Sequence, residues 1–399
     1  MEASCEICKT NKAIYLNISY FYISEKNDNL PNNKPEKLES MKRLLMLIAG
    51  TFLLAGIFSC AGPAERQEEA YTPEGTIIVA SKSGNDVYFI DRKTGETLAV
   101  LPTGLEPHEV EVSDDGRIAV VCNYGNRENP GNTLSVYDVQ HARLDKTIDL
   151  GPHTRPHGMQ WVAGTNNILV TAEGTQSLLV VDVKAGEVVK VLPTGEEVSH
   201  MVAATSDFTR AFVPSIRTGN VAVFDLETGD LIDHIYSGAG AEGIDVSPDG
   251  AEVWVTNRAD NTISIFDTQS LEMLAQLPCE DFPIRARFTP DGRRFLVSNA
   301  RSGTIAVFDA INKLHITDIK LTPPVPADTD AERYFADFEG TSIPIGLVIP
   351  DNKTAYVANT RSDVVSVIDL EKLEITGHFQ AGSEPDGINF SHLSPRPVN

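Results

Sequence analysis

The sequence predicts an all-β fold, a seven-bladed β-propeller. Three observations lead to it: a repeat, the strand pattern inside each repeat, and chain ends that complement each other. The repeat is a run of alternating apolar residues closed by aspartate, as in LSVYD and ISIFD. It recurs at roughly the 40–45-residue period of propeller blades, with one longer final interval. The closing residues are Asp91, Asp138, Asp182, Asp225, Asp267, Asp309 and Asp369.

The pattern inside one repeat predicts four antiparallel strands per blade. In the fifth repeat, β-branched and aromatic residues alternate with polar ones in four segments, at residues 243–247, 252–257, 262–267 and 273–278. Pro248-Asp249-Gly250 is a turn signal between the first two segments. One such sheet cannot bury both of its faces, so the blades must pack against one another around an axis.

The two ends of the repeat region complement each other. The first repeat begins at Ile77 with a second-strand pattern, whereas residues 385–391 match a first strand and nothing more. We therefore expect a 3+1 strand closure, in which the C-terminal strand completes the N-terminal blade. The propeller is expected over residues 76–391, followed by a tail at 392–399.

The segment before the repeats has the features of an export signal. Lys42 and Arg43 precede an apolar stretch that ends at Ser59 and Cys60. This ending resembles the lipobox of bacterial lipoproteins, which implies acylation of Cys60 and a tether in the cell envelope, periplasmic or at the cell surface. An uncleaved signal anchor is the alternative. The remaining boundaries are an extension or upstream sequence at 1–40, a signal peptide at 41–60 and a linker at 61–75.

The charge balance restricts the partners. A formal net charge of −23 repels nucleic acid phosphates, so nucleic acid binding is not expected. We expect a monomer that binds a small anionic molecule or an envelope protein.

One residue per blade opens the innermost strand, and these residues are expected to ring the upper mouth of the axial channel. Three histidines followed by a carboxylate are suitable ligands for Zn, Cu or Fe, so His108, His157 and His200 are candidate metal ligands. The alternative is that each imidazole only fixes loop backbone. In chain order the positions are His108, His157, His200, Glu242, Ile284, Ile345 and Asp386.

Arginines recur in the loops expected on the same, upper face. Arg217, Arg301 and Arg361 occupy matched positions in SIRTG, NARSG and NTRSD, and Arg258 lies in a neighbouring loop. Together they could hold a carboxylate or phosphate. The alternative is a set of surface ion pairs that contribute little. The insertion at 321–343 is expected to pack over the mouth through its aromatic residues.

Two family resemblances add to this reading. VWVTN at 253–257 and AYVAN at 355–359 resemble the YVTN family of propeller repeats, which implies the fold and leaves the activity open. The Pro-His strand openings at 107–108 and 156–157 resemble the seven-bladed propeller lactonases, which implies a histidine as general base. Ile284 and Ile345 depart from that pattern.

No nucleophile elbow, phosphate loop or HExxH motif occurs in the chain. We therefore expect a non-catalytic, membrane-tethered binding protein. The alternative is a lactonase-like or metal-dependent hydrolase or oxidoreductase with a His-lined axial site.

Overall fold

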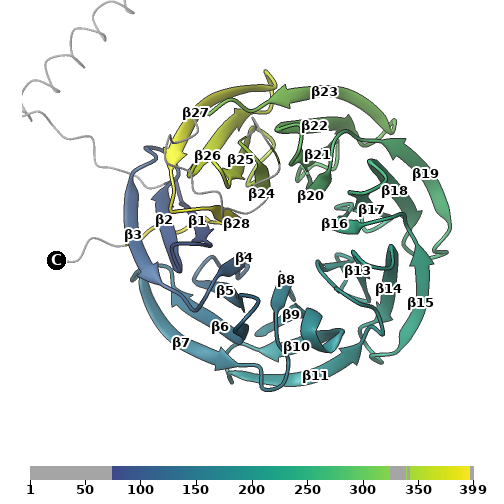
Figure 1. Cartoon of the computed structure of the whole chain (residues 1–399), viewed down its shortest axis with the longest axis horizontal. Coiled ribbons are helices and arrows are strands. Elements are labelled where there is room, and N and C mark those ends of the chain that lie inside the picture. The colour runs from purple at the N-terminus through teal and green to yellow at the C-terminus, as the bar shows by residue number, and fades with distance from the viewer. Residues whose placement is uncertain (1–73, 324–337, 339–341, 396–399) are drawn as a thin grey trace, which may run out of the picture. The chain divides into compact units, whose positions relative to one another are not determined.

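Seven four-stranded antiparallel sheets are arranged around a central axis in the computed structural model (Figure 1). The model describes residues 74–323, 338 and 342–395, all within the second of the chain's two compact units, Thr72–Asn399. The predicted seven-bladed β-propeller is confirmed. The blades are numbered from the N-terminus, and the strands of each blade are given below from the axis outward.

Blade 1 contains β28 (Pro385–Ser391), β1 (Thr76–Ser81), β2 (Asp86–Asp91) and β3 (Thr97–Pro102). Blade 2 contains β4 (Pro107–Val112), β5 (Ile118–Gly125), β6 (Pro130–Asp138) and β7 (Arg143–Asp149). Blade 3 contains β8 (Pro156–Trp161), β9 (Asn167–Ala172), β10 (Ser177–Asp182) and β11 (Glu187–Pro193), with the 3-10 helix η1 (Glu173–Thr175) after β9. Blade 4 contains β12 (Ala203–Ala204), β13 (Arg210–Pro214), β14 (Asn220–Asp225) and β15 (Leu231–Tyr236).

Blade 5 contains β16 (Ala241–Val246), β17 (Glu252–Asn257), β18 (Thr262–Asp267) and β19 (Met273–Pro278). Blade 6 contains β20 (Pro283–Phe288), β21 (Arg294–Asn299), β22 (Thr304–Asp309) and β23 (Leu314–Lys320). Blade 7 contains β24 (Pro344–Val348), β25 (Thr354–Asn359), β26 (Val364–Asp369) and β27 (Glu374–Gln380).

The ring closes through the C-terminal strand. β28 pairs antiparallel with β1, and Ile77 lies opposite Phe390 and Val79 opposite Ile388. This is the 3+1 closure that the chain ends predict. It removes the free inner edge that β1 would otherwise expose.

The recurring aspartates fold the turn between the third and fourth strand of every blade. In each case Oδ1 accepts a hydrogen bond from a backbone N–H two or three residues later. An aspartate that bonds to its own turn in this way favours a tight reversal. The repeat is therefore a turn signal, and its residues lie away from the axis.

Apolar side chains fill the spaces between blades. Seven buried clusters each join one pair of neighbouring blades around the ring. Cys122 and Cys279 are free thiols buried in two of these clusters, as expected for small apolar residues. This packing holds the inner strands at fixed positions around the axis.

Several predictions fall outside the described residues. These include the signal peptide with Cys60 and most of the insertion at 321–343. Phe338 of that insertion is described: it is buried, and its ring meets that of Phe282 edge-on at 5.0 Å. Within 74–323, 338 and 342–395, no helix has the length and apolar character needed to cross a membrane.

Candidate functional site

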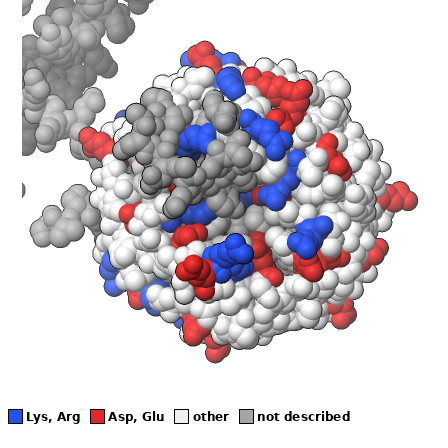
Figure 2. Space-filling view, viewed as in Figure 1, with Lys and Arg blue, Asp and Glu red and all other residues white. Residues whose placement is uncertain are grey.

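A pocket of about 300 Å³ lies on the axis, at the ends where the innermost strands begin. All seven strand-opening residues line it, so aligning the repeats correctly predicts which side chains meet there. Tyr124 of β5, Glu173 of η1 and Arg285 of β20 also line it, together with loop residues: Val198, Ile216, Arg217 and Arg258. In the space-filling view, Lys and Arg side chains gather around the centre of this face, with Asp and Glu among them and along the outline (Figure 2).

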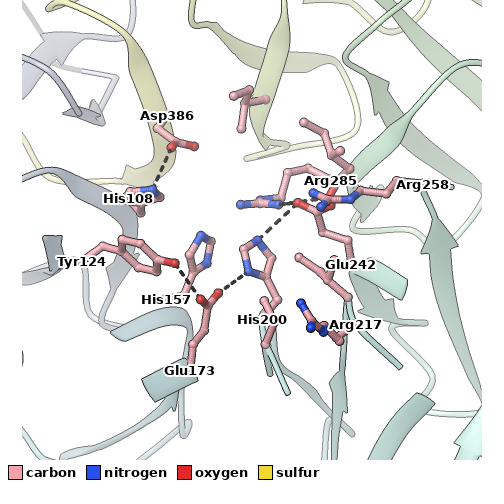
Figure 3. Close-up of a pocket in the computed structure, with 14 residues that line it drawn as sticks. His108, Tyr124, His157, Glu173, His200, Arg217, Glu242, Arg258, Arg285 and Asp386 are labelled. Atoms are coloured by element: carbon pink, nitrogen blue, oxygen red, sulfur yellow. Dashed lines mark hydrogen bonds and ion pairs between the residues drawn. The ribbon is translucent and has the colours of Figure 1, made fainter. Parts of the chain in front are cut away.

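His200 is held between two buried carboxylates (Figure 3). Its Nδ1 lies 2.6 Å from Glu173 Oε1, and its Nε2 lies 3.3 Å from Glu242 Oε1. Burial alone would lower the pKa of His200, but these two partners raise it above its usual value. The Tyr124 hydroxyl donates to the other oxygen of Glu173 at 2.6 Å. The two carboxylates thus favour the protonated form of His200 and fix its ring within the pocket wall.

His157 lies against His200, with ring centroids 3.7 Å apart and planes inclined by 33°. Burial, together with the positive charges of His200 and Arg285, holds the pKa of His157 well below its usual value. Its Nδ1 is buried without a hydrogen-bond partner and lies 3.9 Å from Glu109 Oε1. The pKa values of the two stacked imidazoles are therefore shifted in opposite directions.

Asp386 occupies the blade 1 side of the pocket. Its Oδ2 lies 4.0 Å from His108 Nε2, and its Oδ1 is buried without a hydrogen-bond partner. Burial and the nearby Glu109 raise the pKa of Asp386 to about 7. The pKa of His108 is well below its usual value because of burial and the nearby Lys82. Asp386 thus titrates near neutral pH next to a neutral imidazole.

Arg285 lines the pocket and reaches across the axis. It comes from β20 in blade 6, and its Nε and Nη2 lie 3.0 and 2.8 Å from Glu109 Oε1 on β4 in blade 2. Its Nη1 donates to Glu242 Oε1 of blade 5 at 3.1 Å. Blades 2 and 6 are not neighbours in the ring (Figure 1). The guanidinium therefore links three blades across the pore.

The four predicted arginines divide into two groups. Arg217 and Arg258 line the pocket: Arg217 pairs with Glu197 at 2.8 Å, and Arg258 pairs with Glu242 at 2.7 Å. Arg301 and Arg361 are not among the lining residues, and both contact Phe338 instead. The Arg301 guanidinium lies over the Phe338 ring, and Arg361 donates a hydrogen bond to the Phe338 carbonyl oxygen. The arginine ring predicted from the matched loops is therefore only half assembled at the pocket.

The predicted metal ligands share the pocket without forming a coordination sphere. Among the residues that the structure describes, no group of three or more His, Cys, Asp or Glu side chains is placed to hold a metal ion. The stacking of His157 on His200, and the bonding of His200 to two carboxylates, account for this. A bound Zn, Cu or Fe ion remains a prediction that this geometry does not favour.

Comparison with known proteins identifies the propeller family to which the chain belongs. A family model described as a YNCE-like beta-propeller matches residues 63–324. The chain belongs to that family. Protein NirF of Pseudomonas aeruginosa is 23% identical over 222 residues, covering 52% of this chain and 55% of NirF. The chain thus spans about half the length of that curated relative.

Solved structures of similar shape extend the comparison of this YNCE-like propeller. Kuenenia stuttgartiensis hydrazine synthase has a TM-score of 0.61 at 18% identity, covering 75% of this chain and 93% of the other. The periplasmic gluconolactonase PpgL of Pseudomonas aeruginosa has a TM-score of 0.63 at 16% identity, covering 79% and 99%. These likenesses show a shared fold.

Sequence reasoning missed the central residue of this YNCE-like propeller, Arg285. It directly follows the strand-opening residue Ile284, at a position where four of the seven blades have glycine: Gly158, Gly243, Gly346 and Gly387. Glu109 is the other charged residue at that position. When the repeats are aligned, one positive and one negative residue stand at a position that is mostly glycine. This pattern could have predicted an ion pair across the axis.

Proposed function

We propose that the axial pocket binds a small anionic molecule, and that the protein does so outside the cytoplasm. The observation that carries the proposal is that Arg217 and Arg258 reach one small pocket in a protein of net charge −23. The pocket volume lies at the lower end of the range for small-molecule sites. A small molecule therefore fits it better than an envelope protein does.

Both arginines retain donors for a ligand. The contact of Arg217 with Glu197 uses Nε, and the contact of Arg258 with Glu242 uses Nη1. A guanidinium carries five N–H donors in a fork that matches a carboxylate. Arg285 and His200 are buried and direct their nitrogens at carboxylates within the wall, so they shape the site. Arg217 and Arg258 are more exposed and are therefore the residues that receive the anion.

Calorimetric titration with acetate, succinate, malate and citrate tests the proposal. The double variant Arg217→Gln/Arg258→Gln is expected to lose at least about tenfold in affinity, because a hydrogen bond to a charged group contributes about 1.5–3 kcal/mol. Arg117→Gln, at an exposed residue outside the pocket, is the control and should bind as the parent does. Unchanged affinity in the double variant would refute the assignment of the two arginines.

A second candidate is acid–base catalysis, which the presence of a neutral His157 and a carboxyl of raised pKa, Asp386, in the same pocket favours. Groups whose environments shift their pKa values in opposite directions suit the roles of base and acid. PpgL, a fold relative, is described as a gluconolactonase. Acid release from glucono-lactone measures this activity: we expect His157→Gln to reduce turnover by at least about 100-fold. Turnover no faster than the uncatalysed reaction would reject the candidate.

The extracytoplasmic location is supported by the export-signal pattern before the propeller and by the periplasmic description of PpgL. The finer proposal is a lipid tether at Cys60. Cys60→Ala should abolish incorporation of labelled palmitate and release the protein from membranes. Continued labelling of that variant would place the lipid elsewhere.

A further inference from the structure

Two side chains on one side of the pocket have unused hydrogen-bonding capacity. Neither ring nitrogen of His157 makes a hydrogen bond with the described residues, and Asp386 likewise makes none. Both side chains line the pocket and are almost completely buried, at 1% and 2% exposure. Buried polar groups in native proteins nearly always have partners, so a ligand is the expected partner here.

The surroundings of His157 decide what kind of partner it needs. Its Nδ1 is buried and points to Glu109 Oε1, 3.9 Å away, which favours the tautomer with the proton on Nδ1. The low pKa keeps the ring neutral, so Nε2 is left as a hydrogen-bond acceptor. A carboxylate oxygen cannot donate to this nitrogen. The ligand must therefore bring an O–H or N–H group.

Asp386 lines the same pocket as His157, and His108 lies near both, 4.0 Å from Asp386 and with its ring centroid 5.2 Å from that of His157. Because the pKa of Asp386 is about 7, the carboxyl is near half-protonation at neutral pH and can donate as well as accept. A hydroxyl group on a ligand can likewise both donate and accept a hydrogen bond. The titratable and charged groups whose fields reach Asp386 are Lys82, His108, Glu109, His200 and Arg285.

The rest of the wall offers a ligand fewer polar atoms. His200, Glu173, Glu242 and Arg285 bond to one another. Ile284 and Ile345 supply apolar surface from blades 6 and 7. The groups left for a ligand are the two arginines at the mouth and, deeper in the wall, His157 and Asp386.

We propose that the ligand is a small hydroxy acid whose hydroxyl group bonds to His157 Nε2 and the Asp386 carboxyl, while its carboxylate meets Arg217 and Arg258. This rests on the proposed function, since the carboxylate end uses the same two arginines. His157 is then the residue that distinguishes a hydroxylated acid from its deoxy counterpart. A site built for a hydroxyl discriminates strongly against a ligand without one, because its own polar groups stay unpaired.

Succinate, malate and aspartate test this, because they differ only in the substituent on one carbon: hydrogen, hydroxyl or ammonium. Calorimetry at pH 7 should show malate binding at least about tenfold more tightly than succinate, the effect of one well-formed hydrogen bond. At pH 6, where Asp386 is mostly protonated, aspartate should bind more weakly than malate, because its ammonium group cannot accept a hydrogen bond from the carboxyl.

Two variants separate the hydroxyl contact from a structural role. His157→Phe keeps a ring beside His200 and removes both nitrogens, so the ratio of malate to succinate affinity should fall to about one. His141→Phe, at an exposed turn, is the matched control. Asp386→Asn should make the preference for malate independent of pH between 6 and 8, whereas in the parent it should decline as Asp386 ionises.

The outcomes distinguish this inference from the proposed function. Equal affinity for malate and succinate, or tighter binding of aspartate at pH 6, would overturn the hydroxy acid proposal and leave the anion site standing. A malate preference that survives in His157→Phe would also overturn it. If none of the three acids binds, the proposed function fails and this inference fails with it.

Discussion

At the scale of single residues, the pocket shifts the pKa values of similar side chains in opposite directions. His157 and His200 stack at 3.7 Å, yet His200 has two carboxylate partners and His157 has none at hydrogen-bond distance. Burial lowers the pKa of His157, and the positive charge on a protonated His200 lowers it further, so His157 stays neutral. The wall thereby favours the protonated form of one imidazole and leaves the other available to a ligand.

Asp386→Asn should show how much the buried carboxylate of Asp386 lowers the free energy of unfolding. The pKa of Asp386 is about 7 in the fold against 3.8 for an ordinary aspartate, so the folded state binds the extra proton between these values. Stability from this group is therefore lost as pH rises from about 4 to 7. At pH 8 we expect the variant to be more stable than the parent by on the order of 2–4 kcal/mol, and at pH 4 nearly equal.

Denaturant unfolding at pH 4 and pH 8 measures this difference. Asp145→Asn, at a largely exposed side chain 3.7 Å from Arg143, is the control and should change little at either pH. A variant that is less stable than the parent at pH 8 would show that Asp386 is stabilised as a carboxylate.

At the scale of elements, inner strands approach each other more closely than side chains normally allow. A Cβ added at Gly387 of β28 would lie 2.2 Å from His108 O and 2.4 Å from Glu109 Cα, both in the backbone of β4. A Cβ at Gly346 of β24 would lie 2.0 Å from Asp386 O. Glycine at this position lets adjacent blades meet tightly at the axis, which brings the seven opening side chains together.

Gly387→Ala should separate blade 1 from blade 2 and weaken the closing blade. Because the obstacle is backbone and cannot rotate away, we expect a loss of at least about 2 kcal/mol in the free energy of unfolding. Gly377→Ala on the outer strand β27 meets nothing within 4 Å and is the matched control. It should be neutral or slightly stabilising, since alanine restricts the unfolded chain. Equal stability of the two variants would contradict this account of the axis.

At the scale of the whole molecule, most of the architecture could be read from the sequence because each blade repeats the same local signals. The turn aspartates and alternating strands fix the blades, and the incomplete ends fix the closure. The ring of opening residues followed from aligning the repeats. The contacts of Arg285 and Tyr124 could not be predicted that way, because each depends on side chains of other blades that lie at no fixed distance in the sequence.

The ion pair between Arg285 and Glu109 stabilises the ring as a whole, because it joins blades 6 and 2 across the axis. Both side chains are buried, and removal of one member of a buried pair typically costs about 3–5 kcal/mol because the other charge stays in place. Arg285→Met should therefore destabilise the protein by that order, since it leaves Glu109 and Glu242 without their shared cation. Denaturant unfolding gives the value.

A double-mutant cycle shows whether the loss comes from the pair across the pore. Adding Glu109→Gln to Arg285→Met should recover at least about 1 kcal/mol, because the uncompensated charge is removed. Arg117→Met at an exposed arginine, 3.7 Å from Asp115, should cost nearly nothing. Two outcomes would contradict this account: Arg285→Met as stable as the parent, or a double variant whose loss in unfolding free energy is the sum of the two single losses. Either would show that packing around the ring holds blades 2 and 6, and not the ion pair across it.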